Sequence, residues 1–561
     1  MRGWQIGEIL TSRRRMRHPM AWRESGAQQV SWDEALAEAA ASLARLRSED
    51  PHSIGIVIGD SLSNEEVFAA RRFADLLGTP NVASLGLEID APAIHGLEET
   101  LGAPYRAPQR EELDGVDLFV CVNSNLQHIN PRAAGAMARH IQQGAARMVL
   151  IDEVDQGLAA WAEVYAWHPP GMRAEALRQL AAATAGETQP GPLSGNHLRA
   201  VGAALAGSRR LGILASAGAL SGLEEGLALG ALARALRAEA RWVGTYLLPS
   251  GANTFGTLDM LAAEGRLPGG MSATRMVRPG RGPRALITIG EDLGRLYGPT
   301  ELAALREHLE FELALASFSS PMTEAARLVL PVSMAGERAG SIRHADGHVW
   351  WSEQVVRPAG EARPIAVVLN ALADALGESR QWGEMESIWA AIREQVPGYR
   401  HVALEALRRG ELPSVGLDAA DVASVVDPHA LTASGTGPAQ TDAEHPFVLV
   451  PRSDRAGWIT DPRCQAAHLL RREATVLREP YLIMAAADMK QLGVREGGRV
   501  QVATAEGTLN MRVRADAGVP LGVTVLPAEF PAVVRALVGN GEAERLGSRP
   551  VAGSIEPAEV R

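Results

Sequence analysis

Residues 54–78 read IGIVIGDSLSNEEVFAARRFADLLG, and this stretch decides the fold class. Its first half is a short, β-branched apolar run of the kind that forms a buried strand, and it ends in a Gly-Asp-Ser turn. Its second half, from Asn64, has the spacing of a helix that ends at Gly78. The same order of strand, helix and strand recurs at 118–122, 131–143 and 148–152. Strands that alternate with helices predict a parallel sheet covered on both faces.

The alternation continues on both sides of these segments. Ser31 and Glu34 have the spacing of a capping box that opens a helix to about Arg45. Further strands are predicted at 211–214, 285–290, 311–316 and 328–331. Near the C-terminus, short alternating strands at 500–504, 509–513 and 522–527 predict a small β-barrel. The predicted fold class is α/β, with two or three parallel-sheet lobes and a C-terminal β-barrel domain.

A chain of 561 residues is too long for one hydrophobic core, so several domains are expected. Residues 413–444 lose periodicity and collect Gly, Pro, Ser, Thr and Asp, a composition typical of a linker. The predicted division is an N-terminal segment at 1–50, a first α/β lobe at 51–185, a second at 186–345, a return segment to the first lobe at 346–412, the linker at 413–444 and the barrel domain at 445–561.

Composition excludes several classes of function. The net charge is −11 and only residues 13–17 are strongly basic, so nucleic acid is not an expected partner. No apolar run reaches the length of about 18 residues that spans a membrane, and no such run follows the arginines at 13–15, so we expect a cytoplasmic protein. The two cysteines, Cys121 and Cys464, can form neither a disulfide scaffold nor a four-cysteine cluster.

Several phrases, in the correct order along the chain, resemble landmarks of the molybdopterin oxidoreductase superfamily. They are Arg17-His18-Pro19-Met20 with 30–36, Asn64-Glu65-Glu66 with 77–82, 252–256 with Pro268-Gly269-Gly270, Gly290-Glu291-Asp292, Leu330-Pro331 with Glu337 and Gly340, and Ala487-Asp488 with 492–494 and 497–500. The resemblance implies parallel-sheet lobes of molybdopterin oxidoreductase type. In this family a pterin dithiolene holds molybdenum or tungsten, and a protein side chain usually completes the ligand set.

The sequence departs from that pattern at the metal ligand. The resemblance places the ligand at Ile89, which has no donor atom, so no metal ligand is expected. The neighbouring Asp90 is the best substitute ligand. Glu88 and Asp90 are also weak catalytic candidates as a proton-handling pair, and they could equally cap a turn before Pro92.

The expected cofactor contacts are eroded as well. The weak candidates that the resemblance implies are Asn123, Asn125, Asp152, Gly171, Asn253, Gly256, Gly290, Glu291, Gly340 and Ser341. Asparagine stands at 123 where the family usually has glycine, Arg173 stands where aspartate is typical, and His344 stands where asparagine is usual. These changes favour a degenerate cofactor site.

In this respect the chain most resembles the C-terminal part of the large iron-sulfur subunit of NADH:quinone oxidoreductase (complex I), without the iron-sulfur domain. The resemblance implies a structural subunit of a multi-subunit electron-transfer complex. It would carry no cofactor, would contact an iron-sulfur protein and other subunits, and would associate with the inner face of the membrane only through those partners. Whether such a subunit is catalytic by itself stays open.

Two alternatives remain. One is a molybdenum or tungsten oxidoreductase that binds molybdopterin guanine dinucleotide, acts on formate or a C1 compound and passes electrons to a partner's clusters. The other is a component that binds an organic C1 carrier without redox chemistry. Isolated histidines favour neither: His95, His128, His168, His344 and His348 are interpreted as ordinary core or surface residues, because the i, i+4 pair at 344 and 348 flanks a turn rather than sharing a helix face.

Overall fold

The computed structural model describes residues 5–122, 126, 130–155, 157–220, 222–239, 241–263, 267–378, 382–416, 438–452, 461–476, 479–539 and 550–558. The chain divides into two compact units. The first consists of Met1–Ile89, Gly251–Ala430 and Thr460–Ala474. The second consists of Asp90–Ser250, Leu431–Ile459 and Thr475–Arg561.

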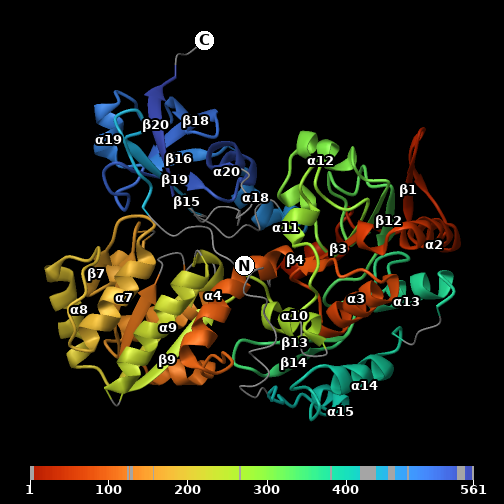
Figure 1. The fold of residues 1–561 in the computed structure, drawn as a ribbon, viewed down its shortest axis with the longest axis horizontal. Helices are drawn as coiled ribbons and strands as arrows, with labels where there is room; N and C mark the ends of the chain where they lie inside the picture. The colour runs from red at the N-terminus through yellow and green to blue at the C-terminus, as the bar shows by residue number, and fades with distance from the viewer. Residues whose placement is uncertain are drawn as a thin grey trace. The chain divides into compact units, whose positions relative to one another are not determined.

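The first unit is built on a seven-stranded sheet (Figure 1). The strand order is β2 (Gly26–Gln29), β1 (Met20–Arg23), β12 (Leu328–Pro331), β11 (Phe311–Ala316), β10 (Ala285–Ile289), β3 (Ile54–Ile58) and β4 (Val82–Ser84). Strands β12 to β4 are parallel, and β1 joins β12 antiparallel. Every residue of β3 and β10 is buried, so both faces of the central strands are covered.

Helices of the first unit begin where their capping residues predict. Ser31 and Glu34 form a capping box that opens α2 (Trp32–Glu49), which confirms the sequence pattern. Ser63 and Glu66 form a second box at the start of α3 (Asn64–Leu77), and Gly78 ends that helix in the left-handed conformation. Helix α3 packs against α10 (Thr254–Leu261) and α13 (Ile365–Ala375).

The second unit has a five-stranded parallel sheet. Its order is β7 (Val164–Trp167), β6 (Arg147–Asp152), β5 (Leu118–Val122), β8 (Arg210–Ser216) and β9 (Trp242–Leu248). Helices α7 (Arg173–Thr184), α8 (Gly195–Ala206) and α9 (Leu223–Ala238) lie beside this sheet (Figure 1). All residues of β5 are buried, as expected for a strand covered on both faces.

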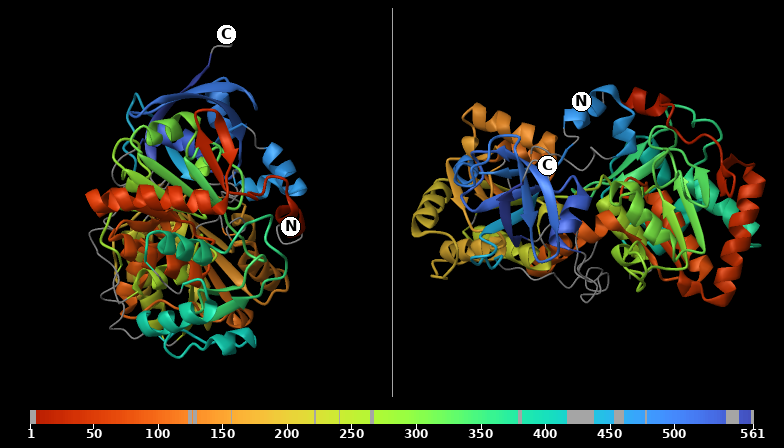
Figure 2. Two further views of the ribbon diagram at one scale, coloured as in Figure 1. Left: turned by 90° about the vertical axis from the view of Figure 1, so that its right-hand side faces the viewer. Right: turned by 90° about the horizontal axis from the view of Figure 1, so that it is seen from above.

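The second unit also contains a closed six-stranded barrel, drawn in blue in Figure 2. Around the barrel the strands are β15 (Phe447–Arg452), β19 (Val523–Pro527), β16 (Tyr481–Met484), β18 (Thr508–Ala515), β17 (Arg499–Ala503) and β20 (Val551–Pro557). Inward residues such as Val500, Val502 and Val513 alternate with exposed ones. Val154, just after β6, packs against Val450 and Val525 of the barrel.

The predicted α/β class with parallel sheets and a C-terminal barrel is confirmed. The sheets do not follow the predicted lobes, however: the segments 51–185 and 186–345 each contribute strands to both sheets. The reason is that the chain leaves the seven-stranded sheet after β4, forms the whole five-stranded sheet, and returns with β10. No helix among the described residues is both long enough and apolar enough to cross a membrane.

Candidate functional site

A pocket of about 100 Å³ opens at the carboxyl ends of β3, β10, β11 and β12 in the first unit. The residues that line it are Asp60, Ser61, Leu62, Gly290, Glu291, Asp292, Arg295, Ala316, Ser317, Phe318, Ser320, Thr323, Val332, Ser333, Met334, Ala335, Arg338, Ile365, Asp461, Pro462 and Arg463. In open α/β sheets this edge is where ligands bind, at the point where the strand order reverses.

The strand order reverses between β3 and β10. After β3 the chain adds β4 on one side, whereas after β10 it adds β11 and β12 on the other. The two loops that leave β3 and β10 touch at glycines: a Cβ at Gly59 would overlap the carbonyl of Gly290. Gly290 has a φ of +65°, a conformation that favours glycine. Both glycines therefore allow the loops to meet at the base of the pocket.

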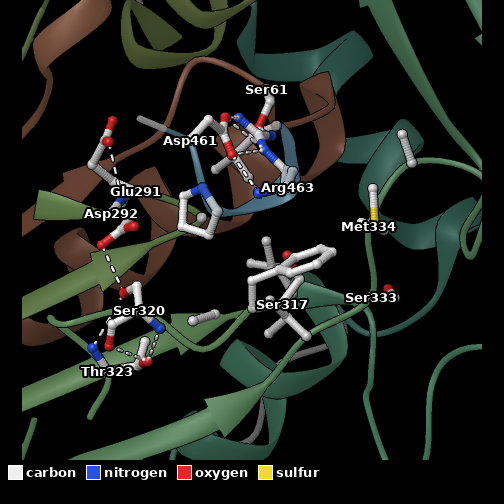
Figure 3. A pocket seen from close by; sticks show the side chains of 18 of the residues that line it. Ser61, Glu291, Asp292, Ser317, Ser320, Thr323, Ser333, Met334, Asp461 and Arg463 are labelled. Atoms are coloured by element: carbon white, nitrogen blue, oxygen red, sulfur yellow. Dashed lines mark hydrogen bonds and ion pairs between the residues drawn. The ribbon is translucent and has the colours of Figure 1, made fainter. Parts of the chain in front are cut away.

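The polar wall of the pocket carries carboxylates and guanidiniums (Figure 3). Arg295 pairs with Glu291 at 2.7 Å, and Arg463 pairs with Asp461 and donates to the Ser61 hydroxyl at 3.2 Å. Burial raises the pKa of Glu291, and the neighbouring Arg295 only partly opposes it. Burial also opposes ionisation of Asp461, but Arg463 and Arg295 outweigh it and lower the pKa of that carboxyl.

Asp292 is held differently from its neighbour Glu291. Its carboxylate accepts a hydrogen bond from the Ser320 hydroxyl at 2.8 Å and another from the Gly294 amide at 3.0 Å. Burial raises the pKa of Asp292 despite these bonds. Of the cofactor contacts implied by the sequence, Gly290 and Glu291 lie in this pocket.

Four other candidates lie together in a buried network of the first unit and do not line the pocket. Asn253 donates to Asn64 at 3.0 Å, and Asn64 donates to the Ser341 hydroxyl at 3.0 Å. Ser341 in turn donates to Glu65 at 2.7 Å. Asn253 and Ser341 are fully buried, and side chains at Gly256 and Gly340 would collide with this network. These residues join α3, α10 and β13 (Gly340–Arg343).

Asp152 belongs to a buried ion cluster in the second unit, and Gly171 lies next to this cluster. The ion cluster consists of Asp152, Glu153, Arg173, Glu225 and Arg452. Arg452 binds both carboxylate oxygens of Asp152, one of them at 3.0 Å, and Glu153 at 3.1 Å. Arg173 pairs with Glu153 at 3.1 Å and with Glu225 at 2.9 Å. The Gly171 amide donates to Glu153 at 3.1 Å.

Burial and the neighbouring arginines act in opposite directions on the pKa of Asp152 in the ion cluster. Burial opposes ionisation of Asp152, but Arg452 and Arg173 outweigh it and lower its pKa to about 2. His168 is fully buried beside the cluster, with Nδ1 2.9 Å from the Pro169 carbonyl, and burial lowers its pKa. No described residue hydrogen-bonds to its Nε2. Burial therefore favours the neutral form of the His168 side chain.

The candidates around the expected metal ligand lie on α4 (Leu85–Leu101). Glu88 accepts hydrogen bonds from the Ala273 amide and from the amide and hydroxyl of Thr274, so it caps α11 (Ala273–Met276). Asp90 is fully buried and accepts from the amide and hydroxyl of Ser250, at 2.7 and 2.8 Å. Each carboxylate is engaged with a different element, so the two do not form a proton-handling pair with free oxygens.

Asn123, Asn125 and His128 lie outside the described residues. His344 is 53% exposed, and both it and His348 lie within 3.3 Å of Asp346. In the part of the chain that the structure describes, no group of three or more His, Cys, Asp or Glu is arranged to hold a metal ion.

Sequence reasoning missed several residues of the pocket and of the ion cluster. Asp60 and Asp461 line the pocket, and Glu225 and Arg452 complete the ion cluster. Arg452 lies 300 positions from Asp152, and no local pattern links them. The one usable signal was the arginine at 173, where the superfamily pattern has an acid.

The molybdopterin cofactor implied by the resemblance does not fit these residues. Asp152, its expected polar contact in the second unit, already has both oxygens on Arg452. Displacing one partner of a buried ion pair costs about 3–5 kcal/mol. Ile89 offers no donor atom, and the oxygens of Asp90 already accept hydrogen bonds.

Two family models match parts of the sequence: molybdopterin oxidoreductase over residues 15–187, and the molydopterin dinucleotide binding domain over residues 463–549. A subunit of NADH-quinone oxidoreductase from Rhizobium meliloti is 23% identical over 590 residues, which cover 95% of this chain and 66% of the relative. A formate dehydrogenase subunit alpha from Methanocaldococcus jannaschii is 23% identical over 236 residues, or 40% of this chain and 35% of the relative. The solved structure of acetylene hydratase from Pelobacter acetylenicus matches with a TM-score of 0.75 at 15% identity, over 100% of this chain and 94% of the other. The chain thus spans only part of the two curated relatives.

Proposed function

We propose that this chain is a member of the molybdopterin oxidoreductase superfamily that serves as a non-catalytic subunit of a multi-subunit redox complex and binds no pterin cofactor. In this role the two sheets and the barrel supply packing surfaces for partner subunits, among them an iron-sulfur protein. The chain would reside on the cytoplasmic side and approach the membrane only through those partners.

One observation carries the proposal: the carboxylates of the ion cluster are already paired with guanidiniums of this chain. Asp152 and Glu153, at the carboxyl end of β6, are paired with Arg452 and Arg173, and all four side chains are buried. A cofactor that took the place of either guanidinium would leave a buried carboxylate without its partner, which is strongly unfavourable. The cluster therefore favours a fold that is stable without the cofactor.

The similarity to a subunit of NADH-quinone oxidoreductase supports the choice of a redox complex over an isolated enzyme. The similarity to a formate dehydrogenase subunit supports the alternative, a working molybdenum or tungsten enzyme for formate or another C1 compound. The two proposals differ in metal content, which makes them separable by one measurement.

The test is purification of the native complex from its source through a tag on this chain. Molybdenum and tungsten are then measured by mass spectrometry, and pterin is measured by fluorescence after oxidative release. We expect co-purifying subunits that include an iron-sulfur protein, and neither metal in stoichiometric amount. A formate dehydrogenase prepared in parallel is the positive control. Molybdenum or tungsten at one atom per chain, together with pterin, would contradict the proposal and favour the alternative.

A further inference from the structure

The arginine-rich stretch at 13–17 contains a buried anchor and an exposed edge. Arg15 is buried and binds both carboxylate oxygens of Glu337, one of them at 2.7 Å. Arg13 and Arg14, which precede it, are exposed. The buried ion pair therefore holds in place the segment that presents two guanidiniums to solvent.

Apolar side chains lie beside this segment in the first unit. Helix α1 (Ile6–Thr11) ends just before it, and Ile6 and Leu10 lie four residues apart on one side of that helix. Leu10 borders Gly336, where a Cβ would lie 3.9 Å from Leu10 Cδ1 and 3.7 Å from Val355 Cγ2. The side chains of Leu10 and Val355 are therefore neighbours.

The other end of α1 lies against α18 (His468–Val476), as Figure 2 shows. The side-chain oxygen of Gln5 accepts hydrogen bonds from the amides of Leu469 and Leu470, each at 3.2 Å. These bonds join the first turn of α18 to the start of α1. Leu469 is thereby brought to the end of α1 that carries Ile6.

Together these side chains form an apolar strip, which consists of Leu469, Ile6, Leu10, Val355 and Val356. Val355 is 75% exposed, Ile6 is 43% exposed, and Leu469 and Val356 are each 39% exposed. Among the described residues eight large apolar side chains are exposed, and four of them belong to this strip. Exposed apolar groups that gather in one place mark interaction sites, whereas scattered ones are ordinary.

Positive charge borders the apolar strip. Five exposed arginines follow its members along the chain, and they are Arg13, Arg14, Arg357, Arg471 and Arg472. Three exposed glutamates adjoin the same surface, and each accepts a hydrogen bond from within the chain: Glu8 from the His468 amide, Glu324 from the Ser319 hydroxyl and Glu353 from the Trp351 indole. Arginines thus outnumber carboxylates here, although the whole chain has a net charge of −11.

We propose that the apolar strip and its arginines bind an acidic amphipathic segment of a partner subunit. Aliphatic side chains of that segment would pack on the strip, and its carboxylates would pair with the arginines. Arginine is enriched at protein interfaces and binds a carboxylate through two parallel hydrogen bonds. A membrane surface fits less well, because the exposed apolar side chains here are aliphatic, whereas membrane interfaces favour Trp and Tyr.

This inference rests on the proposed role in a complex and assigns one surface of the first unit to a partner. The test is photo-crosslinking in the native complex, purified through a tag on this chain. A benzophenone amino acid replaces Val355 or Leu469, and mass spectrometry identifies what each one captures. We expect both positions to capture one other subunit, through peptides in which Asp and Glu outnumber Lys and Arg. Leu521 is the matched control, because it is 68% exposed and belongs to the second unit, and it should not capture those peptides.

Charge reversal tests the arginines separately. Arg13→Glu combined with Arg14→Glu should lower the salt concentration at which that subunit dissociates by about twofold, because salt already screens the remaining attraction. Arg495→Glu combined with Arg499→Glu makes the same change of charge at exposed positions of the second unit, and it should leave the dissociation unchanged. Circular dichroism establishes that each variant is folded.

The outcomes separate this inference from the proposed function. If no other subunit co-purifies, both are wrong. If subunits co-purify but Val355 and Leu469 capture only neutral or basic peptides, lipid, a second copy of this chain or nothing, the inference about this surface is overturned and the proposed function is not. Insensitivity of the captured subunit to the reversed charges at 13 and 14 would likewise overturn it.

Discussion

Arg452 shows what one buried guanidinium contributes in the second unit. It extends from the last residue of β15, a barrel strand, to two carboxylates at the end of β6. The barrel and the five-stranded sheet are thus joined by charge as well as by the valine contacts around Val154. A neutral side chain at 452 would leave Asp152 buried beside fewer positive charges.

We therefore expect Arg452→Met to lower the free energy of unfolding by about 3–5 kcal/mol, the cost of leaving a buried charge without its partner. Urea denaturation followed by circular dichroism measures the change. Arg409→Met is the matched control: Arg409 and its partner Glu411 are 64% and 55% exposed, and exposed pairs contribute about 0–1 kcal/mol. A cost for Arg452→Met no larger than that of the control would show that the cluster does not hold the unit together.

The pKa of Asp152 predicts how the contribution of its ion pair to stability changes with pH. Its pKa is about 2 in the folded protein, below the ordinary value of 3.8. Because the folded value is depressed, the stabilisation is complete above pH 3.8 and is lost as the pH falls toward 2. The stability difference between wild type and Asp152→Asn should be constant near neutral pH and shrink over that acidic window. Urea titrations at several pH values measure it, and a difference that grows on acidification would contradict the assignment.

At the residue scale, the sequence could indicate chemistry but not partners. The arginine at 173 marked an altered site, and the structure places its guanidinium on Glu153 and Glu225. Glu88 was a catalytic candidate on the basis of position alone, whereas it caps a helix almost two hundred residues later. Ion pairs and caps between distant segments depend on tertiary structure, which no local spacing encodes.

Elements were far more predictable than partners. Ser31 with Glu34 and the β-branched run at 54–58 each specify a local structure, and both occur as expected. Sheet membership was not predictable, because β4 and β5 follow one another in the chain and belong to different sheets. Strand periodicity describes what is buried, not which neighbour provides the hydrogen bonds.

Replacing glycine with alanine should have opposite effects on stability at two positions. One of them lies where the loops after β3 and β10 approach each other. Gly59→Ala would drive a methyl group into the Gly290 carbonyl, and overpacking of this kind costs about 1–3 kcal/mol. Gly135→Ala, inside α6 (Pro131–Gln142), meets nothing within 4 Å and should stabilise the helix by about 0.5–1 kcal/mol.

Thermal unfolding of the two glycine variants measures both changes in stability. If Gly59→Ala is as stable as wild type, the two loops are not in contact as described. A loss of stability in Gly135→Ala would instead contradict the open surroundings of that helical position.

At the scale of the whole molecule, each unit is assembled from three separate stretches of chain. The sequence resembles the superfamily because landmarks of that family are spread over this interrupted chain in a fixed order. It could not establish whether the cofactor is bound, because that depends on which side chains fill the sites after folding. Burial of Asp152 and Arg452 is a property of the assembled unit and not of either segment.

Because the carboxylates of the ion cluster are already paired within the chain, the Tm of the protein should not depend on whether its host supplies the cofactor. A ligand present at a thousand times its Kd stabilises the native state by about 4 kcal/mol, which raises Tm by several degrees in most proteins. If this chain folds without pterin, then protein produced in a host that cannot synthesise molybdopterin should have the same Tm, within about 1 °C, as protein from a competent host. Differential scanning calorimetry of both preparations measures this, and an active formate dehydrogenase produced in the same two hosts shows the shift that cofactor loss causes. A drop in Tm for this chain comparable to that of the control would mean that the native state depends on the cofactor, and the internal ion pairs of Arg452 and Arg173 would then not be its replacement.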